Sequence, residues 1–256
     1  MSDRDLLQVL VDAAGEGERA FNLARGREGR VRVKSSSADL VTEVDLRVQE
    51  ATSDFLRRHV PQACVVAEEA GDSVSTADRI YLDPIDGTLN FVHGFGEHCI
   101  SIGYWSGERP LAGVVRNLST GDLFAAQRGC GAFWNGEAIR PSQRRSTGEA
   151  LVATGWPYDK SLAGRVLSQM GRLIGQCQEI RIIGSAALAM CYVASGVLEG
   201  FWETGLEPWD LAAGTAIALE AGAVVTAHDG SPFQLESGTI LVSNGHLHQR
   251  LIEMIA

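Results

Sequence analysis

The sequence has 256 residues, of which 45% are hydrophobic and 21% are charged, as in an ordinary soluble globular protein. Its formal net charge of −10 argues against nucleic acid or an anionic membrane surface as the main partner. Five cysteines without a CxxC pair favour reduced thiols in a cytoplasmic protein over a disulfide framework or a zinc site. The N-terminus has no long apolar run, so we expect neither a signal peptide nor a membrane-spanning helix.

Two helices are predicted near the N-terminus. Apolar residues recur at close to helical spacing over residues 4–24, which predicts an amphipathic first helix. Residues 25–40 are rich in Gly, Arg, Lys and Ser, and we expect a mobile surface loop there. A second helix is expected to begin at Thr42, which has the spacing of a capping box with Asp45, and to end before Pro61.

Short apolar or alternating runs, separated by Gly, Pro and Asn, predict strands in the middle of the chain. They lie at residues 63–67, 79–82, 99–105, 111–115 and 123–126, and the span 100–133 is typical of an antiparallel meander. After a polar stretch at 141–147, strands and helices alternate. Strands are predicted at 151–154, 179–183, 200–202, 223–226 and 239–243, and helices at 162–174, 186–195, 211–221 and 246–255.

This order of elements predicts the α/β class, with layers of strands and helices packed as a sandwich. We expect a single domain over residues 1–256. The polar stretch at 141–147 would separate two candidate subdomains, residues 1–143 with the metal and phosphate site and residues 144–256 on the substrate side.

The most informative segment is residues 80–88, with the sequence IYLDPIDGT. An apolar run ends in Asp83, a proline turns the chain, and Asp86 follows. Two carboxylates so close together repel each other unless a cation lies between them, and hard divalent ions such as Mg²⁺ prefer oxygen ligands. Gly87 and Thr88 then open a short helix, whose free amides favour an anion such as phosphate.

Further carboxylates occur where predicted strands end or helices begin. Glu68 follows one strand, and Asp210 opens a helix. With Asp83 and Asp86 they bring four negative charges, which two Mg²⁺ ions would neutralise, and a bound phosphate adds a reason for a third ion. Two such ions ~3.5–4 Å apart clamp the attacking and leaving oxygens of an in-line displacement. The adjacent Glu69 is expected to support the cluster from outside or to be solvated.

Asp45 and Thr88 supply the remaining parts of a hydrolytic mechanism. Thr88 would orient a water molecule through its hydroxyl, and Asp45 would accept the proton, so no histidine is needed. The alternative for Asp45 is that it only caps a helix. Lys34, in the 25–40 loop, is expected to be solvated, and the alternative is that it lies over the site when this loop closes.

Other phosphatase and nucleotide-binding chemistries lack their residues. No cysteine is followed six positions later by arginine, and there is no Gly-Lys pair of a nucleotide-binding loop, no GxSxG and no HExxH. The remaining interpretation is direct attack by metal-activated water, without a phosphoenzyme.

These motifs resemble the inositol monophosphatase family of Mg²⁺-dependent, lithium-sensitive phosphatases. The resemblance extends over most of the chain through SADLVTEVD (37–45), EE (68–69), DPIDGTLNFVHG (83–94), GCGAFWNG (129–136), IGSAA (183–187) and WDLAAG (209–214). It implies a five-layered αβαβα sandwich, a homodimer, and two or three Mg²⁺ ions at each active site.

The resemblance also implies roles for individual residues. A first metal would be held by Glu68, Asp83 and the carbonyl of Ile85. A second would be held by Asp83, Asp86 and Asp210, and Glu68 would reach a third through water.

The same resemblance implies the groups that bind the substrate. The amides of Gly87 and Thr88 would bind the phosphate, while Asp45 and Thr88 would position the attacking water, so that Asp45, Thr88 and Glu68 are the catalytic residues. The residues that match contacts to the alcohol part of the substrate are Gly184, Ser185, Ala186 and Glu203.

The leading hypothesis is a Mg²⁺-dependent phosphomonoesterase that acts on a small phosphorylated alcohol, with inositol monophosphate first. Histidinol phosphate is the nearest alternative, because Glu203 could pair with an amine as well as with ring hydroxyls. Fructose 1,6-bisphosphate and 3′-phosphoadenosine 5′-phosphate are further alternatives, although only Arg181 is a candidate for a second phosphate. From another class, the chain could be an inactive regulatory binding protein.

Overall fold

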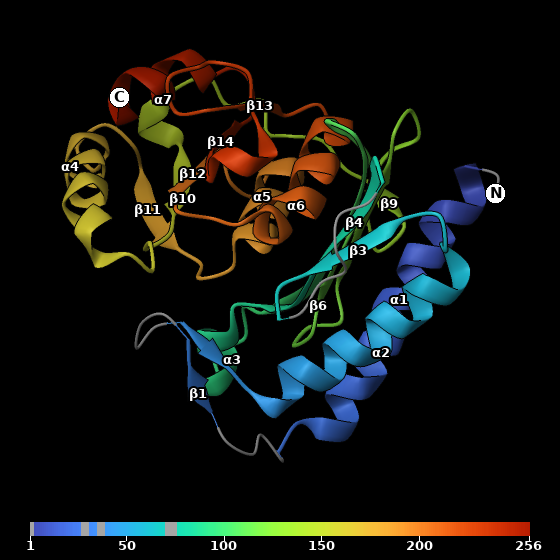
Figure 1. The fold of residues 1–256 in the computed structure, drawn as a ribbon. Helices are drawn as coiled ribbons and strands as arrows, with labels where there is room; N and C mark the ends of the chain where they lie inside the picture. The colour runs from blue at the N-terminus through green and yellow to red at the C-terminus, as the bar shows by residue number, and fades with distance from the viewer. Residues whose placement is uncertain (1–2, 27–30, 35–38, 70–75) are drawn as a thin grey trace.

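The computed structural model describes residues 3–26, 31–34, 39–69 and 76–256. Its elements form five layers, which Figure 1 shows edge-on: two helices, a seven-stranded sheet, two helices, a five-stranded sheet and two outer helices. The prediction of a five-layered αβαβα sandwich is therefore confirmed. No described helix is both long and apolar enough to span a bilayer.

The first layer consists of α1 (Asp3–Ala24) and α2 (Glu43–His59), which lie side by side on the outer face of the seven-stranded sheet (Figure 1). The capping box of α2 is confirmed: Thr42 accepts from the amide of Asp45, and an oxygen of Asp45 lies 2.9 Å from the Thr42 amide nitrogen. As predicted, α2 ends before Pro61.

The expected mobile loop at 25–40 is only partly described, because residues 27–30 and 35–38 lie outside the described ranges. The described part contains two short strands, β1 (Arg32–Val33) and β2 (Leu40–Val41), paired antiparallel. Residues 31–34 are exposed, as expected of a surface segment, but two residues on each side pair as strands, which the sequence did not indicate.

The seven-stranded sheet has the order β3-β4-β5-β6-β7-β8-β9. Its strands are β3 (Cys64–Ala67), β4 (Asp78–Asp86), β5 (Cys99–Ser106), β6 (Arg109–Asn117), β7 (Leu123–Gln127), β8 (Gly131–Trp134) and β9 (Glu137–Ala138). Only β3 and β4 run parallel, so the predicted antiparallel meander is confirmed.

One prediction about this sheet is wrong. The chain does not turn after Leu82, since β4 continues through Pro84 to Asp86, and its register against β5 shifts between Asp83 and Asp86. Such an irregularity accommodates a proline, which has no amide hydrogen to give to a regular ladder. The helix α3 (Thr88–Val92) follows directly.

The five-stranded sheet has the order β11-β10-β12-β14-β13. Its strands are β10 (Leu151–Thr154), β11 (Glu179–Ile182), β12 (Gly200–Thr204), β13 (Val224–Thr226) and β14 (Thr239–Ser243). β10 runs parallel to both β11 and β12, whereas β14 is antiparallel to its neighbours. The outer layer is formed by α4 (Ala163–Leu173) and α7 (His248–Ile255).

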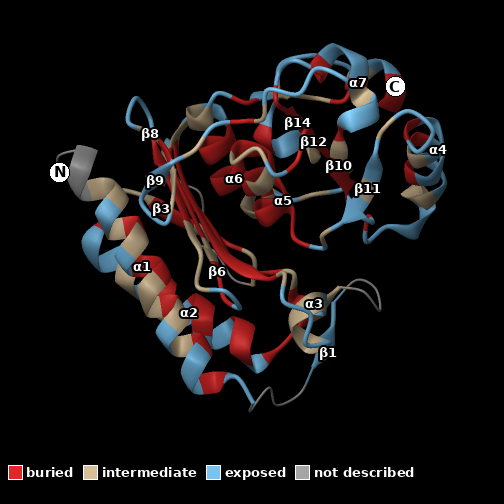
Figure 2. Cartoon of the chain, turned by 180° about the vertical axis from the view of Figure 1, so that it is seen from behind, coloured by how far each residue is buried: buried red, intermediate tan, exposed pale blue. Residues whose placement is uncertain are grey.

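The central layer consists of α5 (Ala186–Ala194) and α6 (Pro208–Ala221), which belong to the second half of the chain. Both are apolar on nearly every side and are largely buried, as Figure 2 shows, which is what a helix between two sheets requires. Because α6 packs on the first half's sheet, the two candidate subdomains share this layer. Their division near 143 stays a prediction.

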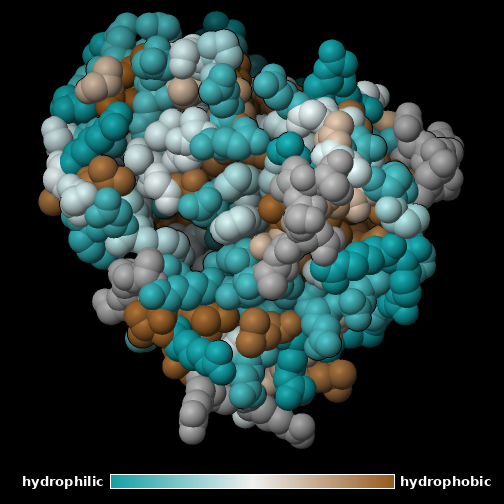
Figure 3. Space-filling view, in the orientation of Figure 1, coloured by the Kyte–Doolittle hydropathy of each residue, from teal (hydrophilic) through white to brown (hydrophobic). Residues whose placement is uncertain are grey.

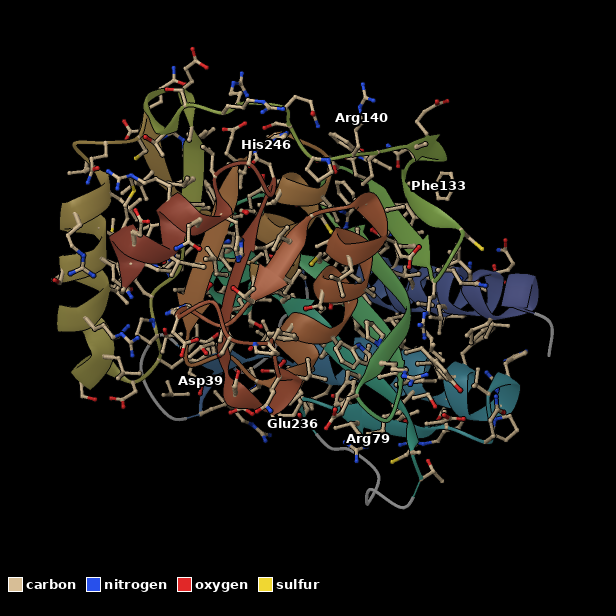
Figure 4. All side chains as sticks on the ribbon, turned by 90° about the horizontal axis from the view of Figure 1, so that it is seen from above. Asp39, Arg79, Phe133, Arg140, Glu236 and His246 are labelled. Atoms are coloured by element: carbon tan, nitrogen blue, oxygen red, sulfur yellow. The ribbon has the colours of Figure 1, made fainter. Side chains whose placement is uncertain are left out.

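Small residues bring α6 very close to the seven-stranded sheet. A Cβ at Gly103 of β5 would lie 2.6 Å from the Cβ of Ala212, and one at Gly113 of β6 would lie 2.4 Å from the carbonyl oxygen of Ala213. Both are below any normal contact distance, so glycine is required at these two positions. A surface ion pair also joins the halves, since Arg79 of β4 lies 3.5 Å from Glu236 (Figure 4).

We expect Gly113→Ala to lower the free energy of unfolding by about 1–3 kcal/mol, because the added methyl group forces α6 away from the sheet. Urea unfolding followed by circular dichroism measures this change. The matched control is Gly171→Ala in α4, where a Cβ meets nothing within 4 Å. This control should stabilise the protein by about 0.5–1 kcal/mol, since alanine favours a helix. Equal stability of Gly113→Ala and its parent would contradict the packing argument.

Candidate active site

Asp45 and Thr88, which are distant in the sequence, are joined by a hydrogen bond. The Thr88 hydroxyl donates to Oδ1 of Asp45 at 2.9 Å and also lies 2.9 Å from the carbonyl oxygen of Ile85. Burial raises the pKa of Asp45, whereas hydrogen bonds from Thr42 and Thr88 oppose that rise. Asp45 therefore caps α2 and also accepts a hydrogen bond from Thr88, while its role as the proton acceptor of the reaction stays a prediction.

Four carboxylates gather beside this pair. Asp83 and Asp86 end β4, and Glu68 follows β3, whose parallel pairing of Ala67 with Leu82 brings it next to Asp83. Asp210 comes from the first turn of α6. Elements from both halves of the chain thus contribute to this cluster. Its role as a metal site stays a prediction.

Main-chain and hydroxyl donors orient three of these carboxylates through a single oxygen. Oδ1 of Asp83 accepts from the amide of Ile85 at 2.9 Å, and Oδ2 of Asp210 accepts from the amide of Glu207 at 2.8 Å. Oδ2 of Asp86 accepts from the Ser185 hydroxyl at 2.6 Å and from the Ala187 amide at 2.8 Å.

Burial and repulsion raise the pKa values of the carboxyl groups in this cluster. Burial raises the pKa of Asp83 well above its usual range, and the neighbouring Glu68, Asp86 and Asp210 raise it further. Burial and then Asp86 raise the pKa of Asp210. For Asp86, burial also raises the pKa, although the bond from Ser185 opposes it. A cation would stabilise all of them.

One cation of the chain already lies against the cluster. The Nζ atom of Lys34 is 2.6 Å from Oε1 of Glu68 and also contacts Glu69. Although burial lowers the pKa of Lys34, the carboxylates of Glu68 and Glu69 raise it overall. Lys34 is an exposed residue, but its ammonium group pairs with two acidic side chains, so the expectation of a solvated lysine holds only in part. Glu69 is correspondingly not solvated, and it supports the cluster through Lys34.

The start of α3 lies against the segment that follows β11. Gly87 has φ +93°, and a Cβ there would lie 2.7 Å from the Glu97 carbonyl oxygen and 3.1 Å from that of Gly184. Gly87 and Thr88 thus lie at the start of α3, where the main chain of Gly184, from the second half of the chain, approaches closely. Their binding of phosphate stays a prediction.

Asn90 holds these two segments together, and the sequence interpretation gave it no role. Its Nδ2 lies 2.7 Å from the carbonyl oxygen of Glu97 and 2.9 Å from that of Ile183. A Cβ at Gly184 would lie 2.7 Å from Nδ2 of Asn90, so glycine is needed there. In the sequence, the one indication of a role for Asn90 was its place inside the DPIDGTLN segment.

Two of the residues expected to contact the alcohol, Ser185 and Glu203, lie on different elements. Ser185 uses its hydroxyl for Asp86 and for the amide of Leu188, at the N-cap of α5, which begins at Ala186. Glu203, in β12, is half-buried beside Gly155. Burial, and then the charge of Asp86, raise the pKa of Glu203 to about 8.

The space-filling view shows a hollow on the face seen in Figure 1, between the parts that carry the two sheets (Figure 3). A separate cavity of about 500 Å³ lies along α1 and is lined also by Phe55, Arg116 and Leu123. It shares no residue with the acidic cluster, so it is not the reaction centre.

Residues 3–256 match the model of the inositol monophosphatase family. The chain belongs to this family. The inositol-1-monophosphatase of Synechocystis is 36% identical, over 98% of this chain and 88% of that protein. The fructose-1,6-bisphosphatase/inositol-1-monophosphatase of Thermotoga maritima is also 36% identical, over 90% of this chain and 88% of that protein.

Two further similarities bear on function. The Nus factor SuhB of Salmonella typhimurium is 36% identical, over 82% of this chain and 80% of that protein. The crystal structure of the extragenic suppressor protein suhB of Bartonella henselae superposes with a TM-score of 0.92 at 32% identity, covering 98% of both chains. As a member of the inositol monophosphatase family, the protein is a hydrolase of the phosphatase class.

The candidate donor set of this family member fits a hard divalent cation, because it offers carboxylate and carbonyl oxygens and the pKa values of its carboxyl groups are raised. Across the described ranges, however, no three acidic, histidine or cysteine side chains are grouped closely enough to hold one ion. The ion pair between Lys34 and Glu68 explains part of this arrangement. Mg²⁺ binding would have to draw the carboxylates together.

Without Mg²⁺, this inositol monophosphatase relative should lose stability as the pH rises. Folded Glu203 keeps its proton up to about pH 8, whereas the unfolded chain loses it near the ordinary value of 4.5. Between these values the folded state binds more protons, so rising pH favours unfolding by up to ~1.4 kcal/mol per pH unit for this group. Glu203→Gln should show a shallower decline.

Urea unfolding in EDTA at several pH values from 5 to 8 measures both curves. The other buried carboxyls act in the parent and in the variant alike, so the difference between the curves isolates Glu203. Parallel curves would contradict the raised pKa.

Proposed function

We propose that the protein is a Mg²⁺-dependent phosphomonoesterase that hydrolyses a small phosphorylated alcohol, with inositol monophosphate as the first candidate. The observation that carries this proposal is the bond between Asp45 and Thr88 at the edge of the acidic cluster. It places a hydroxyl and its proton acceptor beside oxygen ligands of the kind Mg²⁺ prefers. Glu68, Asp83, Asp86, Asp210 and the Ile85 carbonyl are the proposed ligands for two or three ions.

The bound ions would neutralise the carboxylates and lower the pKa of a water molecule. Thr88 directs its hydroxyl hydrogen to Asp45, so its oxygen is left to accept a hydrogen bond from water. Asp45 is enclosed, and its raised pKa makes it a better proton acceptor than an ordinary aspartate. The amides of Gly87 and Thr88 would hold the phosphate in line with that water.

The substrate side supports a polar leaving group. Gly184 lies close to Gly87 at the start of α3. Glu203 can donate or accept a hydrogen bond because its pKa is about 8. The Thermotoga relative's name includes fructose-1,6-bisphosphatase, which keeps a sugar bisphosphate among the alternatives. Histidinol phosphate and 3′-phosphoadenosine 5′-phosphate remain as well. A cytoplasmic homodimer is part of the proposal.

A second function is favoured by one comparison. The similarity to a Nus factor suggests a regulatory binding protein as the alternative. The two functions differ in what they require of Asp83, which a purely regulatory role would not need as a metal ligand.

We expect the purified protein with Mg²⁺ to release phosphate from inositol 1-phosphate, and EDTA to abolish the reaction. Asp83→Asn should lower kcat/KM by about a thousandfold or more while the fold persists, because the neutral side chain weakens the hold on the ion. Phosphate release and circular dichroism measure the two effects. Asp54→Asn, an exposed aspartate of α2, is the matched control. Full activity of Asp83→Asn would refute the metal assignment.

A direct comparison of four substrates identifies the preferred leaving group. We expect inositol 1-phosphate to show the highest kcat/KM among itself, histidinol phosphate, fructose 1,6-bisphosphate and 3′-phosphoadenosine 5′-phosphate, since hydroxyls pair best with a carboxyl that keeps its proton. Steady-state phosphate release at pH 7 with Mg²⁺ gives the ranking. Dominant turnover of histidinol phosphate would reverse it and show that Glu203 pairs with an amine.

A further inference from the structure

The connection between β11 and α5 consists of residues 183–185, which belong to no helix or strand. The side-chain amide of Asn90, in α3, donates to two carbonyl oxygens of this connection. Its Nδ2 lies 2.9 Å from the oxygen of Ile183 and 3.3 Å from that of Gly184. The same nitrogen lies 2.7 Å from the carbonyl oxygen of Glu97. Both hydrogens of the amide are therefore used to hold main chain beside α3.

The connection ends in Ser185, which binds a proposed metal ligand. The Ser185 hydroxyl donates to Oδ2 of Asp86 at 2.6 Å, and the amide of Ala187 donates to the same oxygen at 2.8 Å. Ser185 and Asp86 are both buried. The direction in which the Asp86 carboxylate points therefore depends on where the end of the connection lies.

Two glycines let the connection lie directly against α3. A Cβ at Gly184 would lie 2.7 Å from Nδ2 of Asn90, and a Cβ at Gly87 would lie 3.1 Å from the carbonyl oxygen of Gly184. No further side chain fits between α3 and the connection at these distances. Because Ser185 directly follows Gly184, a shift of Gly184 moves the hydroxyl that holds Asp86.

We propose that Asn90 is a positioning residue for Mg²⁺: its amide fixes the connection so that Ser185 holds Asp86 in the orientation that binds the ion. This inference rests on the proposed function, in which Asp86 is a metal ligand. Hydrogen-bond partners that orient a ligand raise the affinity for the metal, because less freedom of the side chain is lost on binding. Removal of the Asn90 amide leaves the Asp86 carboxylate in the site but lets its direction vary.

The test measures Mg²⁺ binding to Asn90→Ala by calorimetry, with phosphate release from inositol 1-phosphate as a second readout. We expect the dissociation constant for Mg²⁺ to rise about tenfold. At saturating Mg²⁺ we expect kcat to return to within about twofold of the parent, because Asn90 acts only through a metal ligand. The melting temperature is measured for every variant.

Asn244→Ala is the matched control. Nδ2 of Asn244 also binds a segment distant in the sequence, at 2.9 Å from the carbonyl oxygen of Arg144 and 3.1 Å from Oγ of Ser142. β10, β11 and β12 run parallel, so the connection after β11 lies where β12 ends, whereas Asn244 follows the residue of β14 that pairs with the start of β12. Its loss should lower the melting temperature and leave the dissociation constant for Mg²⁺ unchanged.

A double variant shows whether Asn90 acts through Ser185. Ser185→Ala removes the hydroxyl that holds Asp86, so adding Asn90→Ala should weaken Mg²⁺ binding no further. Losses that multiply in the double variant would show two separate effects and would overturn the proposal.

An unchanged dissociation constant in Asn90→Ala, or an equal rise in Asn244→Ala, would also overturn it. If Asn90→Ala does not fold, Asn90→Ser, which keeps one donor, is judged in its place by the same criteria, with an expected rise of about threefold. A parent that binds Mg²⁺ but releases no phosphate contradicts the proposed function, and calorimetry still decides the role of Asn90. A parent that binds no Mg²⁺ overturns the metal assignment and this inference together.

Discussion

Repulsion among buried carboxylates is the constraint on which the rest of this structure depends. Asp86 and Asp210 raise the pKa of Asp83, Asp86 raises that of Asp210, and burial removes the water that would otherwise screen these charges. Charges in such surroundings destabilise a fold unless a partner is present. Lys34 supplies one partner for Glu68. The remaining negative charge is why we expect a small, highly charged cation at this site, and the scaffold must be stable enough to hold these charges together.

That scaffold is the central helix layer with its close contacts to both sheets. α6 brings Asp210 to the cluster, and the N-terminus of α5 holds Asp86 through Ser185 and Ala187. Glycines in the seven-stranded sheet allow α6 to approach to the distance of backbone contact. Packing of small residues therefore stabilises α5 and α6, the same helices that repulsion among the carboxylates destabilises. The second half of the chain supplies these parts, although the first half supplies most of the ligands.

Periodic and local signals predicted most of the fold. The amphipathic pattern of α1, the capping box at Thr42 and the alternation in the meander are local properties, so sequence alone indicated them. Non-local contacts were missed. Pairing of β1 with β2, the continuation of β4 past Pro84 and the ion pair of Lys34 each depend on a partner distant in the sequence. The candidate ligands were predicted because they stand where predicted strands end or helices begin, whereas the bond from Asn90 to Ile183 joins residues that are distant in the sequence.

The side-chain amide of Asn90 has a mechanical consequence. It binds the main chain next to α3 and the main chain after β11, and so fastens the two sheets to each other beside the reaction centre. A separation of the two sheets at this point would have to break the bond from Asn90 to Ile183, which contributes about 0.5–1.5 kcal/mol. The amide of Asn90 therefore favours the closed arrangement of the two halves beside α3.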